Sequence, residues 1–338
     1  MAIIGYAAAL EQFHPTELLD YSRLAERVGF GGVMAADHFQ PWVPKQGHNA
    51  FVWAWMAALG ATTKTMTFGP GVTCASFRYH PAIVAQAAAT QGAMTPGRFW
   101  LGIGTGEALN EHVTGAQWPE PHVRLKMMQE AIGIIKKLLT GELAKHDDGR
   151  FFTMERVRMW TVPDKAHPVP IYVATAAPFA AKWTGANCDG FITPGAGVEK
   201  LQMLIGKFEE GARSVGKDPA KMPKLLQLHM SWAKTEKEAI DNALDQWPNG
   251  GMPFPKGDVR SPEDFEQMAK LVRPESYKNR MIISPDWELH REQIQQFIDL
   301  GFDEIHVHNV GRNQVEFIKA FAKQVLPKLK LSRRKPKS

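Results

Sequence analysis

Eight apolar runs of strand length recur along the whole chain, and stretches with helical periodicity separate them. This alternation is typical of βα units joined in one parallel sheet, rather than of separate α and β domains. Eight such units are the number that closes a barrel. We therefore expect an α/β fold, a (β/α)₈ TIM barrel, with strands at 3–8, 32–36, 66–72, 99–104, 170–175, 190–193, 225–232 and 304–309.

The connecting stretches carry the signals of helices that lie against a sheet. In the first, His14 and Pro15 precede apolar residues at three- and four-residue spacing, and Gly29 ends the pattern. A second helix is predicted from residue 123 to about 139, where Gly141 follows the last apolar position.

Two segments, 147–167 and 249–277, are longer than an ordinary connection, and long segments in compact domains tend to be functional or locally folded. The second contains several prolines and a predicted helix at 262–272, so we expect a lid over the barrel mouth. Because no internal repeat and no Gly/Ser linker interrupts the chain, we predict one domain over 1–331, followed by a basic tail at 332–338.

Composition excludes several classes of function. The chain has 338 residues, of which 44% are hydrophobic, but no apolar run approaches the roughly 18 residues of a membrane span, and the first residues do not show the basic segment and apolar run of a signal peptide. The net charge of +5 falls largely on the tail, so we expect no nucleic-acid or membrane partner. The two cysteines, Cys74 and Cys188, lack metal-ligand spacing, which predicts reduced thiols, no bound metal and a cytoplasmic protein.

The segment ADHFQPW (36–42) places an acid, an imidazole and an indole at the carboxyl end of a buried strand. TIM barrels carry their chemistry at this end, and Glu11 follows the first strand toward the same mouth. His38 can accept a proton near neutral pH, and Asp37 is expected to orient it or raise its basicity. Structural alternatives are a hydrogen-bonded strand-end histidine for His38, packing for Trp42 and a solvated loop acid for Glu11.

The segment GIGTGEALNE (102–111) follows the fourth strand. It partly matches a GxGxxG pattern, but it lacks the third glycine and the helix that should follow, so we do not expect a Rossmann site. Glycines in this position still let the backbone approach a flat ring or a phosphate. Glu107 can manage a proton beside such a ring, or it can simply cap a turn.

Five segments together resemble the luciferase-like superfamily: EQF (11–13), ADHFQPW (36–42), FRYHPAIVAQAAAT (77–90), GRFWLGIGTGEALNE (97–111) and DGFIT (189–193). Within it the chain resembles the branch of F420-dependent glucose-6-phosphate dehydrogenases and F420-dependent secondary alcohol dehydrogenases. The resemblance implies a (β/α)₈ barrel with insertions, a homodimer and the deazaflavin coenzyme F420. The implied reaction moves a hydride from the hydroxyl carbon of a small sugar phosphate or alcohol to C5 of the deazaflavin.

The resemblance also implies roles for single residues. His38 matches the histidine that deprotonates the substrate hydroxyl, and Glu107 matches the acid near the deazaflavin ring nitrogen. Trp42 matches the tryptophan that supports the transition state, Glu11 a second active-site acid, and Asp37 an aspartate beside the cofactor. The family has a non-proline cis peptide that matches bond 71–72, and further cofactor contacts are implied for Gly71, Val72, Cys74, Thr105, Gly106, Asn110, Ala176 and Ala177.

The substrate residues match only in part. Lys256 and Arg280 match two of three basic residues that hold the phosphate in the sugar-phosphate branch. Thr193 begins the loop (193–197) that carries the third, but the lysine of that loop is missing here and Lys200 lies three residues beyond it. The match therefore leaves room for another sugar phosphate or for a neutral alcohol.

The carboxyl-terminal third is closer to a sister group of the same family that is thought to use FMN. Here His229, His306 and His308 lie on predicted strands, where 306 and 308 share one side. We expect them to pack inside the barrel or at the cofactor mouth rather than to bind a metal. Two other functions stay open: an FMN-dependent luciferase-like oxidoreductase or monooxygenase, and a non-catalytic flavin-binding barrel, against which His38, Glu107 and Trp42 together argue.

Overall fold

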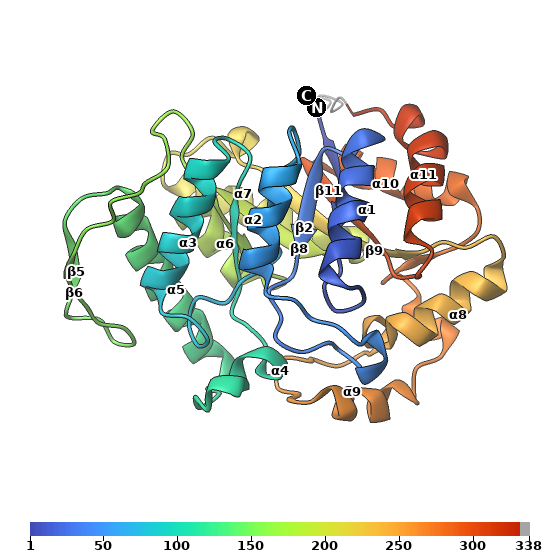
Figure 1. Cartoon of the computed structure of the whole chain (residues 1–338), viewed down its shortest axis with the longest axis horizontal. Helices are drawn as coiled ribbons and strands as arrows, with labels where there is room; N and C mark the ends of the chain where they lie inside the picture. The colour runs from blue at the N-terminus through green and yellow to red at the C-terminus, as the bar shows by residue number, and fades with distance from the viewer. Residues whose placement is uncertain (332–338) are drawn as a thin grey trace.

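In the computed structural model, which describes residues 1–331, eight parallel strands follow one another in the order β3-β2-β1-β11-β9-β8-β7-β4. Bridges from Phe68 to Phe99 and from Thr73 to Ile103 join the two ends of this order and close the barrel. In Figure 1 the strands lie inside the surrounding helices. The strands are β1 Ile3–Ala7, β2 Gly32–Ala35, β3 Thr67–Pro70, β4 Leu101–Ile103, β7 Ile171–Ala174, β8 Gly190–Pro194, β9 Lys224–Ser231 and β11 Glu304–Asn309. All eight overlap the predicted runs, so the (β/α)₈ prediction is confirmed.

Large side chains fill the barrel interior. One buried cluster there consists of Met34, Trp100, Tyr172, Ile192 and Leu225. Glycines on neighbouring strands make room for these rings, since a Cβ on Gly69 would lie 2.3 Å from the Trp100 indole and one on Gly5 would lie 2.3 Å from the ring of His306. The barrel is therefore a packed core, and ligands must bind at its end.

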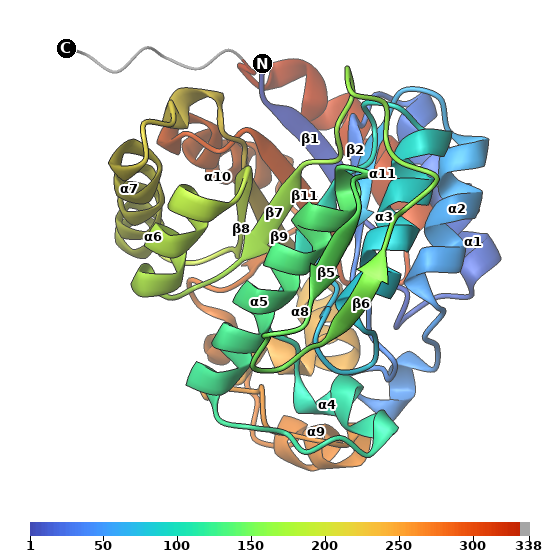
Figure 2. The same ribbon diagram turned by 90° about the vertical axis from the view of Figure 1, so that its left-hand side faces the viewer.

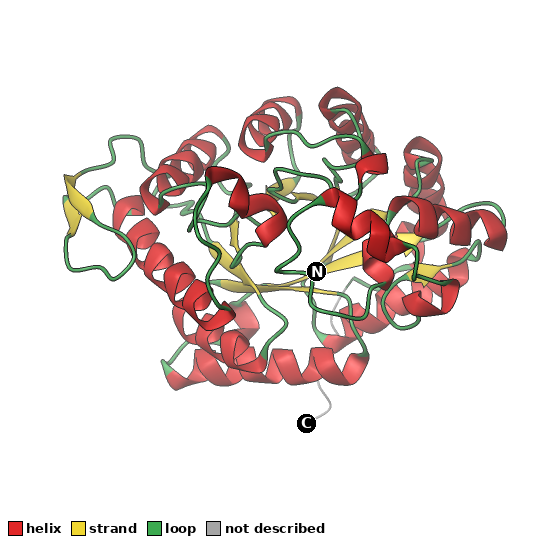
Figure 3. Cartoon of the chain, turned by 90° about the horizontal axis from the view of Figure 1, so that it is seen from below, coloured by secondary structure: helices red, strands yellow, loops and turns green. Residues whose placement is uncertain are grey.

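Helices surround the strands, as Figure 3 shows from below. The outer helices are α1 Pro15–Arg27, α2 Val52–Thr62, α3 Pro81–Met94, α5 Pro121–Leu139, α6 Pro178–Asn187, α7 Val198–Ser214, α10 Trp287–Leu300 and α11 Gln314–Gln324. The His14 side chain caps α1 by accepting from the backbone N–H of Thr16, and Glu17 completes the capping box. Gly29 follows the end of α1 with φ 106°, a left-handed conformation that suits glycine. Both helices predicted from the sequence are confirmed within two residues.

The segment predicted as the long connection 147–167 is folded in part. Its beginning belongs to an antiparallel hairpin, β5 (Ala144–His146) and β6 (Met154–Val157), that lies beside α5 (Figure 2) and projects from the barrel at the left of Figure 1. The Glu130 carboxylate on α5 holds the hairpin turn by accepting from the backbone N–H of Phe152 at 2.9 Å. The strands escaped prediction because they are short and mostly exposed.

The segment 249–277 covers the barrel mouth, as expected. It contains α9 (Pro262–Ala269), which lies with α8 (Glu236–Gln246) and α4 (Ala108–Glu111) at the end where the strands finish (Figure 1). Helix α9 ends at Ala269, three residues before the predicted end. The lid shares one apolar cluster with the loops after β2 and β4, made of Trp42, Val43, Leu109, Ala243, Trp247, Met252, Phe265, Val272, Tyr277 and Val310. A two-residue strand, β10 (Ile282–Ile283), pairs with β9 and was too short to predict.

Among residues 1–331, no helix is long and apolar enough to cross a membrane. Both cysteines are buried and unpaired. The predicted basic tail, 332–338, lies outside the described residues, and the single domain over 1–331 stays a prediction.

Candidate active site

A cavity of about 750 Å³ opens at the carboxyl ends of the strands, with the lid as part of its wall. This volume suits a cofactor together with a small molecule. The predicted site residues that line it are Glu11, Asp37, His38, Trp42, Gly71, Val72, Cys74, Thr105, Gly106, Glu107, Asn110, Ala176, Thr193, Lys256 and Arg280. Ala177 is the exception: it does not line the cavity and is the N-cap residue of α6.

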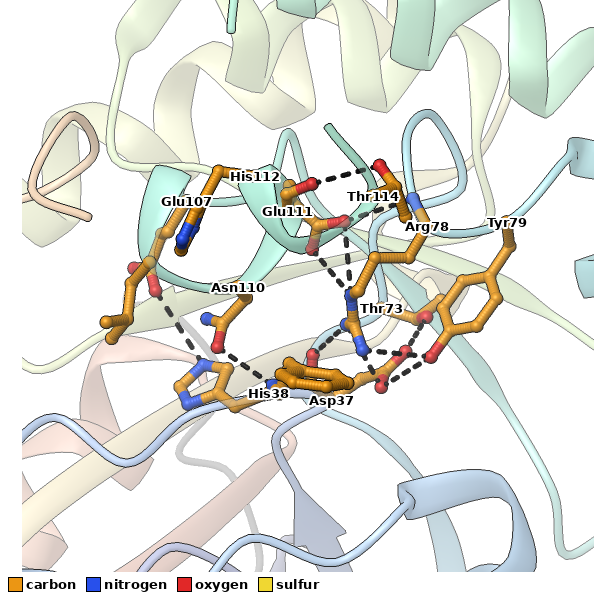
Figure 4. Close-up of polar contacts among 12 residues, drawn as sticks. Asp37, His38, Thr73, Arg78, Tyr79, Glu107, Asn110, Glu111, His112 and Thr114 are labelled. Atoms are coloured by element: carbon orange, nitrogen blue, oxygen red, sulfur yellow. Dashed lines mark hydrogen bonds and ion pairs between the residues drawn. The ribbon is translucent and has the colours of Figure 1, made fainter. Parts of the chain in front are cut away.

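His38 lies between two carboxylates in this cavity. Its Nδ1 is 2.7 Å from Oε1 of Glu11, in the loop after β1. Its Nε2 is 3.7 Å from Oε2 of Glu107, after β4, a contact that Figure 4 shows. The Glu11 side chain is almost fully buried, whereas a third of Glu107 is exposed to the cavity. Glu11 therefore fixes the ring, and the Nε2 side of the imidazole faces the space where a ligand can lie.

The carboxylates set the protonation of this group. Burial alone would lower the pKa of His38, but the charge and hydrogen bonding of Glu11, and the charge of Glu107, outweigh it and raise that pKa above 6.5. Burial also raises the pKa of Glu107 from its ordinary value, against the opposing charges of His38 and Lys256. The site thus holds an imidazole that is more basic than usual beside a carboxyl that is less acidic than usual.

Asp37 does not orient His38 or raise its basicity, contrary to the expectation from the sequence. Its carboxylate points away from the imidazole, toward Arg78 and Tyr79 (Figure 4). It accepts from the Tyr79 hydroxyl at 3.0 Å and from the Thr73 hydroxyl, and it forms an ion pair with Arg78 at 3.2 Å. Glu11 takes the role that the sequence analysis gave to Asp37.

Arg78 is a buried cation that the sequence analysis did not single out. Its side chain is 6% exposed and joins Asp37 to Glu111, whose Oε2 lies 3.2 Å from Nε (Figure 4). Burial lowers the pKa of Arg78, but the two carboxylates outweigh it and raise that pKa. Burial also raises the pKa of Glu111 to about 7, although Arg78 opposes the shift. This network joins the loops after β2, β3 and β4 behind the cavity.

Trp42 connects the lid to His38. The indole is 7% exposed and meets the His38 ring edge to face at 5.3 Å and the Phe265 ring of α9 at 5.2 Å. The Gln46 side chain accepts from the Trp42 backbone N–H at 2.8 Å and so fixes the loop. This stack closes one side of the cavity to water, next to the imidazole.

Asn110 has a structural contact that the sequence could not show. Its side-chain oxygen accepts from the backbone N–H groups of Phe39 at 2.9 Å and Gln40 at 3.2 Å. These bonds tie α4 to the loop that carries His38. Asn110 therefore positions the imidazole in addition to lining the cavity.

One stretch of the wall has few side chains. The Gly71–Val72 peptide bond is cis, as expected, and lies beside the glycines that follow β4. Gly106 has φ 78°, and a Cβ there would lie 2.7 Å from Sγ of Cys74. Oε2 of Glu107 is buried with no hydrogen-bond partner among residues 1–331. A flat heterocycle with a polar edge fits this wall, because bare backbone admits the ring and the carboxyl can meet its edge.

Part of the cavity wall is cationic. Its basic side chains are Lys200, Lys256, Lys278 and Arg280. The Lys256 ammonium donates to the backbone carbonyl of Asn249 at 2.8 Å, and Arg280 donates to that of Met252 at 3.0 Å. The lysine expected in the 193–197 loop is missing, but Lys200 lines the same cavity, and Lys278 adds a further positive charge. Several cations around one space are an anion site.

The strand histidines do not form a metal site. His306 contacts Glu304 at 3.2 Å, whereas His308 contacts His229 and Gln12, each at 2.9 Å. Across residues 1–331, no group of three or more His, Cys, Asp and Glu side chains is placed to hold a metal ion. His229 lines the cavity with Trp247, which the sequence analysis missed because its position depends on the lid.

Comparison with known proteins gives relatives over nearly the whole chain. A family model described as luciferase-like monooxygenase matches residues 4–304. The F420-dependent glucose-6-phosphate dehydrogenase of Kribbella flavida is 37% identical over 330 residues, which cover 97% of this chain and 98% of the relative. That of Intrasporangium calvum is 36% identical over 335 residues, which cover 98% and 99%.

Solved structures of related proteins share this fold over nearly the whole chain. An F420-dependent secondary alcohol dehydrogenase, solved with an F420–acetone adduct, superimposes with a TM-score of 0.90 at 33% identity, over 96% of this chain and 98% of that one. The F420-dependent tetrahydromethanopterin reductase of Methanopyrus kandleri has a TM-score of 0.80 over 97% and 99%, and at 19% identity it supports the fold alone.

Proposed function

The chain belongs to the luciferase-like monooxygenase family, and on that premise we propose that its cavity oxidises a hydroxyl carbon of a small sugar phosphate or alcohol. It is an F420-dependent oxidoreductase that transfers a hydride, as its relatives' names indicate. The observation that carries the proposed chemistry is the His38 imidazole held between Glu11 and Glu107 beside a wall poor in side chains.

Each cavity residue has a separate role in the proposed reaction. F420, when bound, supplies the carbon that receives the hydride. Nε2 of His38 accepts the hydroxyl proton, and Glu11 stabilises the resulting imidazolium through Nδ1. Glu107, whose pKa burial raises, faces the cavity where it can exchange a proton, and Trp42 with the lid excludes water from the reacting atoms.

Cofactor choice is tested by titrating the purified protein with F420 and, separately, with FMN. We expect micromolar binding of F420, because the F420-dependent relatives are 37% and 33% identical over nearly the whole chain. FMN should bind at least about 100-fold more weakly, a difference of about 2.7 kcal/mol. Absorbance and fluorescence of the bound ring give both affinities. Tight FMN binding without F420 binding would instead support the FMN-dependent alternative.

We propose that Lys256 and Arg280 hold an anionic group of the substrate. Removing either charge as Lys256→Ala or Arg280→Ala should raise KM for phosphorylated substrates about 10- to 100-fold, the usual effect of losing a charge-assisted hydrogen bond. Steady-state kinetics measures this, with Lys182→Ala as the control, since Lys182 is half exposed and pairs with Glu210 on the surface. If neither variant raises KM, phosphate has no place in the proposed function.

We also propose a cytoplasmic homodimer, formed through α2 and α3. Neither helix contains a charged residue, and exposed Ile83 and Met94 lie eleven residues apart on one face of α3. Uncharged exposed faces of this kind are typical of interfaces, and a closed dimer uses the same face twice. Light scattering should give twice the 37.7 kDa mass of the chain, and Ile83→Lys should shift the protein toward monomer.

A further inference from the structure

Two histidines on adjacent strands form a polar chain that ends in the cavity. His229 on β9 and His308 on β11 are direct partners in the strand register, and their Nδ1 atoms lie 2.9 Å apart. Nε2 of His308 lies 2.9 Å from Oε1 of Gln12, in the loop after β1. The mechanism described above uses none of these three side chains.

The surroundings fix which way Gln12 faces. Its amide nitrogen contacts two oxygens, the backbone carbonyl of Val310 at 2.9 Å and Oε1 of Gln246 at 3.2 Å. Gln246 is fixed in turn, because its own amide nitrogen donates to Asp245 at 2.6 Å. The side-chain oxygen of Gln12 therefore faces His308 and can only accept, so Nε2 of His308 carries the hydrogen.

Because both imidazoles are neutral, the position of the hydrogen on His308 determines its position on His229. Burial lowers the pKa of His229 to about 3, with a further contribution from the charge of Lys256, and burial lowers the pKa of His308 well below its ordinary value. A neutral His308 with hydrogen on Nε2 has a lone pair on Nδ1. His229 must donate to that lone pair from its own Nδ1, which leaves Nε2 of His229 without a hydrogen.

Nε2 of His229 is free to accept a bond from a ligand. Within residues 1–331 this nitrogen has no hydrogen-bond partner, and it is not among the partnerless polar atoms that are buried, so it is accessible. The residue lines the cavity. The ring packs against Trp247 at 5.2 Å and lies close enough to Lys256 for that positive charge to lower its pKa. The acceptor is therefore beside Lys256, one of the cations of the cavity wall.

We infer that Nε2 of His229 accepts a hydrogen bond from a second substrate hydroxyl, one that lies near the anionic group and is not the hydroxyl oxidised beside His38. The inference rests on the proposed function and narrows its substrate class to a polyhydroxylated anion of the sugar-phosphate kind. A monohydric alcohol would leave this acceptor and the cations unpaired in a partly buried site, which is costly. Gln12 and His308 are positioning residues that hold the lone pair toward the ligand.

Two substitutions at His229 separate its two nitrogens. His229→Asn keeps an amide donor near the place of Nδ1 but ends before the place of Nε2, whereas His229→Gln extends an amide oxygen toward the place of Nε2. Calorimetry on the purified protein, with glucose 6-phosphate and its 2-, 3- and 4-deoxy analogues as probes, measures the recognition of each hydroxyl. Wild type should bind at least one deoxy analogue roughly 10- to 100-fold more weakly than the parent.

His229→Asn should bind the parent sugar as weakly as that analogue, and His229→Gln should recover part of the difference. The inference is overturned if wild type binds all four probes equally, if it binds none of them, or if His229→Asn still discriminates. Failure of the proposed function has a different signature, namely the absence of F420 binding in the titration above.

Nitrogen-15 NMR of the histidine rings tests the tautomers without any ligand or turnover. We expect hydrogen on Nδ1 of His229 and on Nε2 of His308, with both rings neutral at pH 7. A hydrogen on Nε2 of His229 would refute the acceptor assignment, even in a protein that binds F420 and turns over sugar phosphates.

Discussion

His38→Ala should lower kcat for alcohol oxidation about 10²- to 10⁴-fold, the usual contribution of a positioned general base. The imidazole is the group whose Nε2 faces the cavity while Glu11 holds its other nitrogen at 2.7 Å. Cofactor affinity should change much less, because the wall poor in side chains comes from the loops after β3 and β4. Stopped-flow reduction of F420 at saturating substrate measures the rate. Unchanged turnover at saturating cofactor would dismiss His38 as the base.

The pH dependence of the wild-type enzyme tests the same assignment. His38 must be neutral to accept a proton, so kcat/KM for oxidation should fall as the pH drops through its pKa. Because Glu11 and Glu107 raise that pKa, the acidic limb should lie above pH 6.5. Glu11→Gln removes the larger of these two effects and should move the limb to lower pH. A limb that does not move would assign the titration to another group.

The sequence predicted the barrel because each strand is a short apolar run flanked by turn residues, and the helices between them carry caps that act locally. His14 and Glu17 are three residues apart and form the capping box of α1 within the chain's own backbone. His38 and Glu107 were predictable for a related reason, since residues that directly follow a strand must reach the same mouth, whereas the other cofactor and substrate contacts came from the family resemblance.

What the sequence could not give are partners joined across long separations. Asp37 precedes His38 directly, which made it the natural candidate to support the imidazole, but that support comes from Glu11. The true partner of Asp37 is Arg78, on the loop after β3. The acceptor on His229 depends on the register of β9 with β11 and on a glutamine after β1, which no local pattern encodes.

Arg78→Met should destabilise the protein by about 3–5 kcal/mol at pH 8, the usual cost of removing one partner from a buried ion pair. The change leaves the carboxylates of Asp37 and Glu111, both at most 2% exposed, without their cation. Urea unfolding measures the free energy of unfolding. Lys237→Met is the matched control, because Lys237 pairs with Asp241 on the exposed face of α8 and its loss should leave the free energy of unfolding nearly unchanged.

The stability lost in Arg78→Met should depend on pH, and the pKa of Glu111 determines the direction. Burial raises the pKa of Glu111 in the folded protein from 4.5 to about 7, so the native state binds a proton more tightly than the unfolded chain and wild-type stability falls as the pH rises between these values. Arg78 limits this rise in the pKa, so its removal extends the fall to higher pH. The difference between wild type and Arg78→Met should therefore be smaller at pH 5 than at pH 8, and adding Glu111→Gln should abolish most of its pH dependence. Two results would contradict this: a stability difference of equal size at both pH values, or a pH dependence that persists in the double variant. Either would show that Arg78 does not stabilise the charged form of Glu111 and pairs with Asp37 alone.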